Sequence, residues 1–198
     1  MSNIEITVKV NLELNELINY LNSNNFKFHQ SFRCIDSFLI KEEKLKNKLT
    51  YHDLNNCVIF RELIFKNKTI RNIVLKNKKY DENGNIIKSK QINKEVDNFI
   101  EKKKEYLQNG YVELIKMNDY CYTFSKNMHE FIIEHINSLG TFIEFEDRNY
   151  DSNIENGNSI DELIELFDTF NIPYVKDDYF CKKAWLLIKK EKSEYIKE

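Results

Sequence analysis

The chain has 198 residues, of which 41% are hydrophobic and 13% aromatic, so it can bury one sizeable core. Its 30 Lys and Arg residues against 32 Asp and Glu residues indicate no general attraction to nucleic acid or membranes. Four scattered cysteines form no CxxC pair, which predicts reduced thiols rather than a zinc site or disulfides. No apolar run reaches the roughly 18 residues that span a bilayer. We therefore expect a single cytoplasmic domain over residues 1–198, with neither nucleic acid nor a membrane as partner.

Two hydrophobic periodicities divide the chain into elements. Alternation predicts strands over residues 4–10, 26–40, 57–65, 69–79, 86–96, 111–125, 131–136 and 141–146. Helical spacing predicts helices over residues 14–21 and 97–108, a third that is capped at Ser159 and continues to Phe170, and an amphipathic segment over 177–190. Residues 41–56 are expected to form a loose charged connection, residues 81–85 a tight turn, and residues 149–158 a polar loop.

This order favours an α+β fold that is mainly β. Strands outnumber helices, and their hairpin spacing favours an antiparallel sheet that is curled or closed on itself, with helices packed outside. The apolar face of the second helix is expected to comprise Phe99, Ile100, Tyr106 and Leu107. Trp185 lies in an apolar stretch and is expected in the core.

Two short strands carry the residues that point to chemistry. In the first, Glu5, Thr7 and Lys9 share one face, so a carboxylate and an ammonium face the same space. In the last, Glu144 and Glu146 share a face in the same way. An isolated Glu-X-Glu strand is also compatible with a solvated acidic stripe.

The sequence Glu5-Ile6-Thr7-Val8-Lys9 resembles the Glu-X-Glu-X-Lys strand that opens the CYTH family, the triphosphate tunnel metalloenzymes. Thr7 stands where the family has its second Glu. Residues 139–146, with Glu134 ahead of them, are similar to a second family segment that supplies carboxylates to the metal site. The resemblance spans the chain and implies an eight-stranded, closed or nearly closed antiparallel β-barrel whose lumen is a tunnel for triphosphates.

The resemblance also implies roles for individual residues. It implies that Mg²⁺ or Mn²⁺ is bound by four carboxylates, those of Glu5, Glu134, Glu144 and Glu146. It assigns catalytic roles to Lys9 and Arg61, and triphosphate binding to Lys9, Arg61, Lys76, Lys90 and Lys116. One family arginine is missing: Ile59 replaces it in one register, and in a register shifted by two residues Leu63 replaces the other arginine. Asp119 lies where a basic residue would be expected. Asp36 matches an acidic position of the family, although a structural hydrogen bond would explain it equally well.

The implied function is that of a metal-dependent enzyme acting on a triphosphate, as a monomer or a homodimer. Length and the segment Leu139-Gly140-Thr141-Phe142-Ile143-Glu144 are most similar to class IV adenylyl cyclases, which convert ATP to cAMP and pyrophosphate. The same site could instead hydrolyse tripolyphosphate, thiamine triphosphate or a nucleotide. A third alternative is an inactive protein that binds a nucleotide, a polyphosphate or a protein partner.

Overall fold

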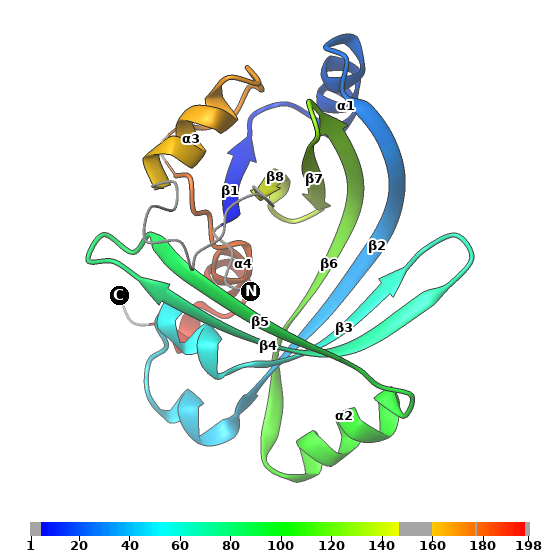
Figure 1. The fold of residues 1–198 in the computed structure, drawn as a ribbon. Helices are drawn as coiled ribbons and strands as arrows, with labels where there is room; N and C mark the ends of the chain where they lie inside the picture. Colours follow the sequence, from blue (N-terminus) through cyan, green and yellow to red (C-terminus); the bar gives the residue numbers. More distant parts are fainter. Residues whose placement is uncertain (1–4, 147–159, 177, 197–198) are drawn as a thin grey trace. The chain divides into compact units, whose positions relative to one another are not determined.

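The structure is a computed structural model, and it describes residues 5–146, 160–176 and 178–196 (Figure 1). The predicted polar loop over residues 149–158 and the predicted cap at Ser159 lie outside the described residues. Across the described part of the chain, no helix combines the length and the apolar character needed to cross a membrane.

Eight strands form one sheet, in the order β1-β8-β7-β6-β2-β3-β4-β5. The strands are β1 (Glu5–Val10), β2 (Lys27–Lys41), β3 (Val58–Ile64), β4 (Thr69–Tyr80), β5 (Ile86–Glu95), β6 (Tyr111–Lys126), β7 (His129–Ile136) and β8 (Gly140–Glu146). Each begins and ends close to its predicted bounds. The predicted fold class is confirmed: a mainly β, α+β fold with eight antiparallel strands of the curled, barrel type.

Four α-helices and three short 3-10 helices complete the described structure. They are α1 (Leu14–Ser23), α2 (Phe99–Gln108), α3 (Ile160–Asp168), α4 (Lys183–Glu191), η1 (Glu42–Lys46), η2 (Tyr51–Asn56) and η3 (Ser193–Tyr195). The connection over residues 41–56 is therefore more ordered than predicted, because it contains η1 and η2. In the described part of the amphipathic segment predicted over residues 177–190, the helix begins only at Lys183.

The chain divides into two compact units. The first unit comprises Met1–Ser31, Lys78–Lys90 and Tyr120–Cys181, and the second comprises Phe32–Asn77, Gln91–Asp119 and Lys182–Glu198. Strands β2, β4, β5 and β6 contribute residues to both units. That the whole chain is one domain stays a prediction.

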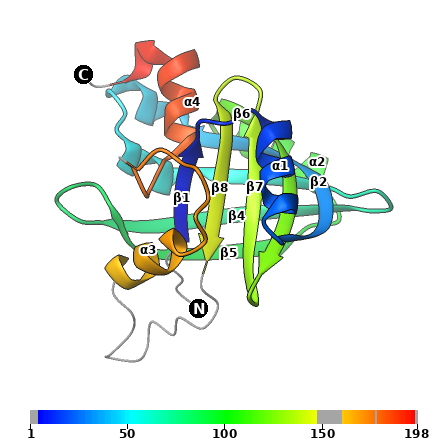
Figure 2. The same ribbon diagram turned by 90° about the horizontal axis from the view of Figure 1, so that it is seen from above.

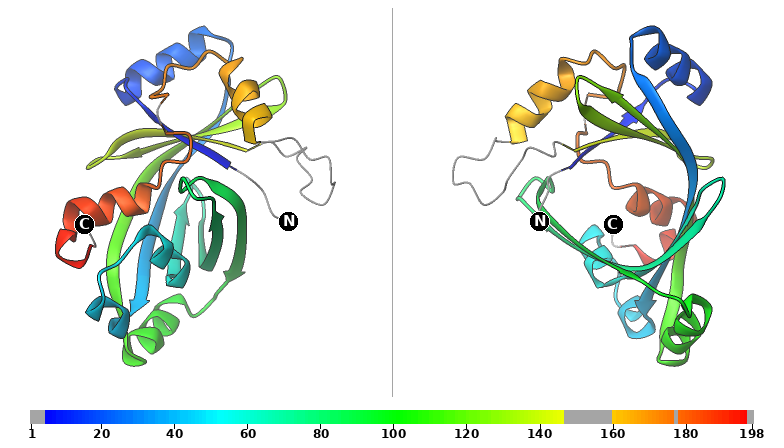
Figure 3. Two further views of the ribbon diagram at one scale, coloured as in Figure 1. Left: turned by 90° about the vertical axis from the view of Figure 1, so that its left-hand side faces the viewer. Right: turned by 45° about the vertical axis from the view of Figure 1, so that its right-hand side comes forward.

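The core of the first unit lies between strands and two helices. Strands β1, β8 and β7 lie side by side (Figure 2). One face of them presents apolar side chains, which bury Leu17 of α1 and Phe167 of α3 completely. Figure 3 shows α1 and α3 on the same side of these strands. Because this face is filled by the core, the polar side chains that alternate with it must lie on the other face.

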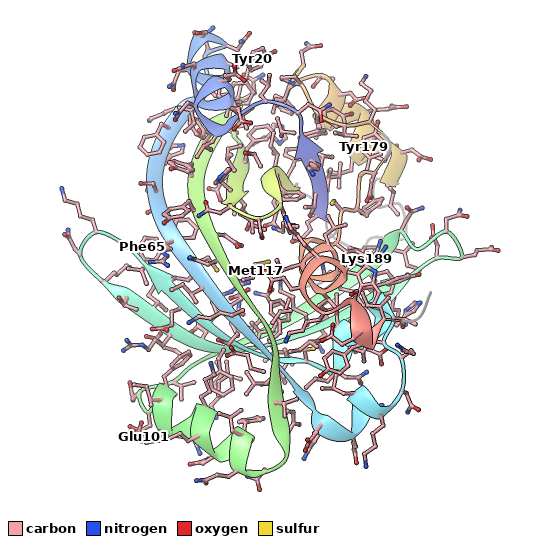
Figure 4. All side chains as sticks on the ribbon, turned by 180° about the vertical axis from the view of Figure 1, so that it is seen from behind. Tyr20, Phe65, Glu101, Met117, Tyr179 and Lys189 are labelled. Carbon is pink, nitrogen blue, oxygen red and sulfur yellow. The ribbon has the colours of Figure 1, made fainter. Side chains whose placement is uncertain are left out.

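A segment that follows α3 covers the outer edge of β1. The Thr7 amide donates to the Tyr179 carbonyl at 3.0 Å, and the Cys181 amide donates to the Thr7 carbonyl at 2.8 Å. Further along, the Val175 amide donates to the Lys9 carbonyl at 2.8 Å. Figure 4 labels Tyr179 in this segment. These bonds satisfy the edge of β1 and fix the strand that carries Glu5, Thr7 and Lys9.

The second unit has a smaller apolar cluster beneath α2. Phe99 of α2 meets Phe60 of β3 edge to face, with ring centroids 5.3 Å apart, and Tyr106 packs on the same ring. The predicted apolar face of α2 is therefore only half correct. Ile100 is 59% exposed and Leu107 is 43% exposed, because only the stripe through Phe99 and Tyr106 reaches β3.

The remaining core predictions hold. All four cysteines are free and buried, as expected for reduced thiols. Burial, with the nearby Asp53 charge, raises the pKa of the Cys57 thiol to about 12. Trp185 is buried, as predicted.

Candidate functional site

Strand register places the predicted residues of the first unit on one face. Thr7 lies opposite Glu144, and Lys9 lies opposite Phe142. On the next strand, Glu134 also lies opposite Phe142. Partners that lie opposite each other in an antiparallel pair project from the same face. We call the set Glu5, Thr7, Lys9, Glu134 and Glu144 the polar face.

The members of the polar face differ in their exposure. Lys9 is exposed, whereas Thr7 and Glu134 are buried. Glu5 and Glu144 are intermediate. Glu146 ends β8 opposite Glu5, and its side chain lies outside the described residues. The exposed ammonium of Lys9 is thus available to an anion from solution.

Lys78 joins the polar face from a distant strand. Its ammonium donates to Glu5 Oε1 at 3.2 Å, although β4 and β1 are not neighbours in the sheet. Burial lowers the pKa of Lys78, but the negative charges of Glu5 and Glu144 outweigh burial and raise that pKa above its ordinary value. Sequence analysis missed Lys78. The available signal was its alternation with Lys76 in a strand that continues to Tyr80.

In the second unit, Arg61 is held by a buried carboxylate. Its Nε donates to Asp36 Oδ1 at 2.7 Å and its second terminal nitrogen donates to Asp36 Oδ2 at 2.5 Å. Burial opposes ionisation of Asp36, but the Arg61 charge and its hydrogen bonds outweigh burial and hold the pKa of that carboxyl below its usual range. The structural hydrogen bond considered for Asp36 is therefore present.

Lys76 shares a sheet face with Arg61. Arg61 lies opposite Asn72, and Lys76 is four residues further along the same strand. The charge of Lys76 lowers the pKa of Asp36, which indicates proximity. Arg71 lies on the opposite face, where its Nε contacts Glu62 Oε2 at 3.0 Å. This is the orientation that alternation predicts.

Asp119 adds a second buried carboxyl to this region. Burial raises its pKa to about 6, the Asp36 charge adds to that rise, and the cation of Lys183 opposes it. The side chain of Lys183 is half-buried. The second unit therefore combines two carboxyls with the cations of Arg61, Lys76 and Lys183.

The two remaining predicted lysines lie at exposed positions. Lys116 is exposed on β6. Burial opposes ionisation of Glu113, but the hydrogen bond and charge of Lys103, with a smaller contribution from Lys116, hold the pKa of that carboxyl below its ordinary value. Lys90 is exposed on β5, the last strand in the sheet order. Their predicted binding of a triphosphate stays a prediction.

The described side chains do not make up a complete divalent-metal site. Carboxylate oxygens are the ligands that Mg²⁺ and Mn²⁺ prefer, and Glu5 and Glu144 supply them. Among the described residues, however, no group of three or more His, Cys, Asp or Glu side chains is arranged to hold a metal ion. The Glu5 carboxylate already accepts a hydrogen bond from Lys78. Thr7 lies between Glu5 and Glu144 on this face and offers no charged ligand.

Comparison with known proteins identifies the fold. No protein-family model matches the chain, and no curated protein matches its sequence. A solved structure from Pyrococcus horikoshii superposes with a TM-score of 0.69 at 16% identity, covering 96% of this chain and 99% of that one. The "putative adenylate cyclase" of Vibrio parahaemolyticus gives 0.59 at 13% identity, covering 93% and 97%.

A third similar structure comes from Hippeastrum. It is named as a "putative adenylyl cyclase" that reveals a dominant triphosphatase activity, and it gives a TM-score of 0.57 at 13% identity, covering 95% of each chain. At these identities the likeness shows the fold alone, and it extends over nearly the whole length of each protein. The fold that the resemblance implied is thereby confirmed. The chain has a CYTH-like fold.

Proposed function

We propose that the chain binds a triphosphate and acts on it as a CYTH-type enzyme. The observation that carries this proposal is that Glu5, Lys9 and Glu144 share one face of the sheet. A triphosphate carries several negative charges, so its binding needs positioned cations. The exposed ammonium of Lys9 supplies one of them. The predicted contributions of Arg61, Lys76, Lys90 and Lys116 are part of the proposal, and each can be tested by removing its charge.

We further propose that Mg²⁺ or Mn²⁺ accompanies the triphosphate. Such an ion supplies positive charge that stabilises the negative charge developing on phosphate oxygens during transfer. Glu5 and Glu144 offer oxygen ligands of the appropriate kind, although the described side chains complete no site of three ligands.

The most specific form of the proposal is a class IV adenylyl cyclase-like reaction. The ribose 3′-hydroxyl of ATP would attack the α-phosphorus, and pyrophosphate would leave. The protein would contribute mainly by positioning the reacting groups and by stabilising charge. The Vibrio neighbour, described as a putative adenylate cyclase, supports this form.

Two alternatives each have a specific observation in their favour. The Hippeastrum neighbour is described as having a dominant triphosphatase activity, which supports hydrolysis in place of cyclisation. Thr7 opposite Glu144 supports binding without turnover, because a hydroxyl cannot replace a carboxylate as a charged metal ligand.

Product analysis separates these functions. The purified protein is incubated with ATP, tripolyphosphate or thiamine triphosphate in the presence of Mn²⁺, and cAMP, pyrophosphate and orthophosphate are quantified. Appearance of cAMP with pyrophosphate identifies a cyclase, and orthophosphate identifies a triphosphatase. A rise in melting temperature without any product identifies a binding protein. The enzymatic proposal is overturned if no triphosphate is converted, and triphosphate binding is overturned as well if none stabilises the protein.

A further inference from the structure

The ion pair between Lys78 and Glu5 places a protein cation where the resemblance implies a metal. The ammonium lies 3.2 Å from Glu5 Oε1, and the Glu144 charge also acts on it. We propose that Lys78 is the built-in counter-ion of Glu5 and Glu144, so that the polar face binds no divalent ion before a triphosphate arrives. This deepens the proposed function, on which it rests for the identity of the ligand.

Charge counting on the polar face supports this role. Glu5, Glu134 and Glu144 bring three carboxyl groups, and Lys78 and Lys9 bring two ammonium groups, so the two ammonium groups offset two of the three carboxyl charges. Thr7, which lies opposite Glu144, adds no charge. A divalent ion entering this set would meet two ammonium groups and a carboxylate that already has a donor. Repulsion between the ion and these two ammonium groups would weaken the binding of the ion.

The location of Lys78 makes the contact persistent. Its side chain is 19% exposed and that of Glu5 is 27% exposed, so solvent screens the pair less than it screens a surface pair. Strand β4 holds Lys78 by the sheet ladder, and strand β1 is held along its outer edge by the segment after α3. Neither backbone has to move for the ion pair to form.

A direct measurement of Mn²⁺ binding without any triphosphate tests the role of Lys78. The signal of free Mn²⁺ in electron paramagnetic resonance is recorded during titration of wild type, Lys78→Met and Lys79→Met. Lys79 is the matched control, because it is the adjacent lysine of β4 and is exposed. We expect negligible binding by wild type and Lys79→Met. Lys78→Met should bind at least about tenfold more tightly, since a neighbouring charge changes carboxylate equilibria by this order.

A double-mutant cycle sharpens the test. Thr7→Glu adds a third carboxylate but leaves Lys78 in place, so alone it should raise Mn²⁺ affinity little. Combined with Lys78→Met it should give the tightest binding, and the two effects should be more than additive. No gain in Mn²⁺ affinity from Lys78→Met, in either the wild-type or the Thr7→Glu background, would show that Lys78 does not compete with the ion, and this would overturn the proposal.

The Mn²⁺ titration remains decisive if a variant folds poorly or if the protein binds no triphosphate. A wild-type protein that binds Mn²⁺ measurably without a triphosphate overturns the proposal, whether or not the Lys78→Met variant folds well. Lys78→Gln, which keeps a polar side chain, serves as the second charge-removing variant. Because no triphosphate is present, the outcome is independent of the proposed function. If Mn²⁺ behaves as expected and no triphosphate binds, the counter-ion role stands and the proposed function fails.

Discussion

Arg61 and Asp36 form a two-point ion pair across β3 and β2, with donor–acceptor distances of 2.7 and 2.5 Å. The Asp36 side chain is 1% exposed and that of Arg61 is 19% exposed. An arginine held in this way stabilises a buried carboxylate whatever else it binds. The loss of activity in an Arg61 variant is therefore informative only when the stability of that variant is known.

Arg61→Met should lower the free energy of unfolding by roughly 3–5 kcal/mol, because it leaves the Asp36 charge buried without its partner. Urea unfolding measures this. Arg71→Met is the matched control, because its ion pair with Glu62 is more exposed than that of Arg61 with Asp36 and should cost less than about 1 kcal/mol. Adding Asp36→Asn to Arg61→Met should restore much of the loss. Equal costs for the two arginine variants would contradict the structural role of Arg61.

Local sequence patterns predicted most of the elements and the polar face. Alternation was sufficient to put Glu5 and Lys9 on one face of β1, since strand geometry fixes where alternate side chains point. That Glu144 shares this face follows from the register of β1 against β8. Lys78 could not be predicted as a partner of Glu5 in this way. That contact joins strands that are not neighbours in the sheet, and local alternation carries no information about such a long-range contact.

The α2 helix shows another limit of sequence analysis. Helical spacing indicates which apolar residues lie near each other on the helix, but it does not indicate how wide the buried stripe is. Phe99 is buried against Phe60, whereas Ile100 and Leu107 are exposed at the margins. In Figure 4, Glu101 is labelled on the same helix, where it is also exposed.

This arrangement predicts unequal effects of substitution on α2. Phe99→Ala should reduce the free energy of unfolding by about 3–5 kcal/mol, because it leaves a cavity beside Phe60. Ile100→Ser should change it by less than about 1 kcal/mol, since surface substitutions away from special features have small effects. Chemical denaturation of both variants gives the comparison. A large loss for Ile100→Ser would mean that this face is covered in solution.

Lys9→Glu should abolish triphosphate binding without loss of stability. Lys9 is exposed, so its replacement disturbs no core contact, but the new carboxylate repels the phosphate oxygens. The melting temperature is measured with and without tripolyphosphate and Mn²⁺. Lys27→Glu, an exposed change elsewhere on the first unit, is the control and should keep the ligand-induced shift. A shift that survives in Lys9→Glu would place the binding cations elsewhere.

Asp119 should make the stability of the protein depend on pH. Burial raises its pKa to about 6 from the ordinary 3.8, so between these values the folded state binds more protons than the unfolded state. The free energy of unfolding attributable to this group therefore falls as pH rises from about 4 to about 7. Its unfavourable contribution is fully present above the folded pKa and absent below the unfolded one.

Asp119→Asn should remove this dependence, because the amide has a similar shape and does not ionise. Near pH 8 the variant should be more stable than wild type, by up to about 3 kcal/mol, and near pH 4 the two should converge. Asp36 provides a control of opposite sign. Because its pKa is lowered in the folded state, its ionisation adds to the free energy of unfolding at neutral pH, and this stabilisation is lost in acid. The measurement is the denaturant midpoint of unfolding for wild type and Asp119→Asn between pH 4 and pH 8. A wild type that gains stability between pH 4 and pH 7 relative to Asp119→Asn would show that the cations of Arg61, Lys76 and Lys183 outweigh burial at Asp119.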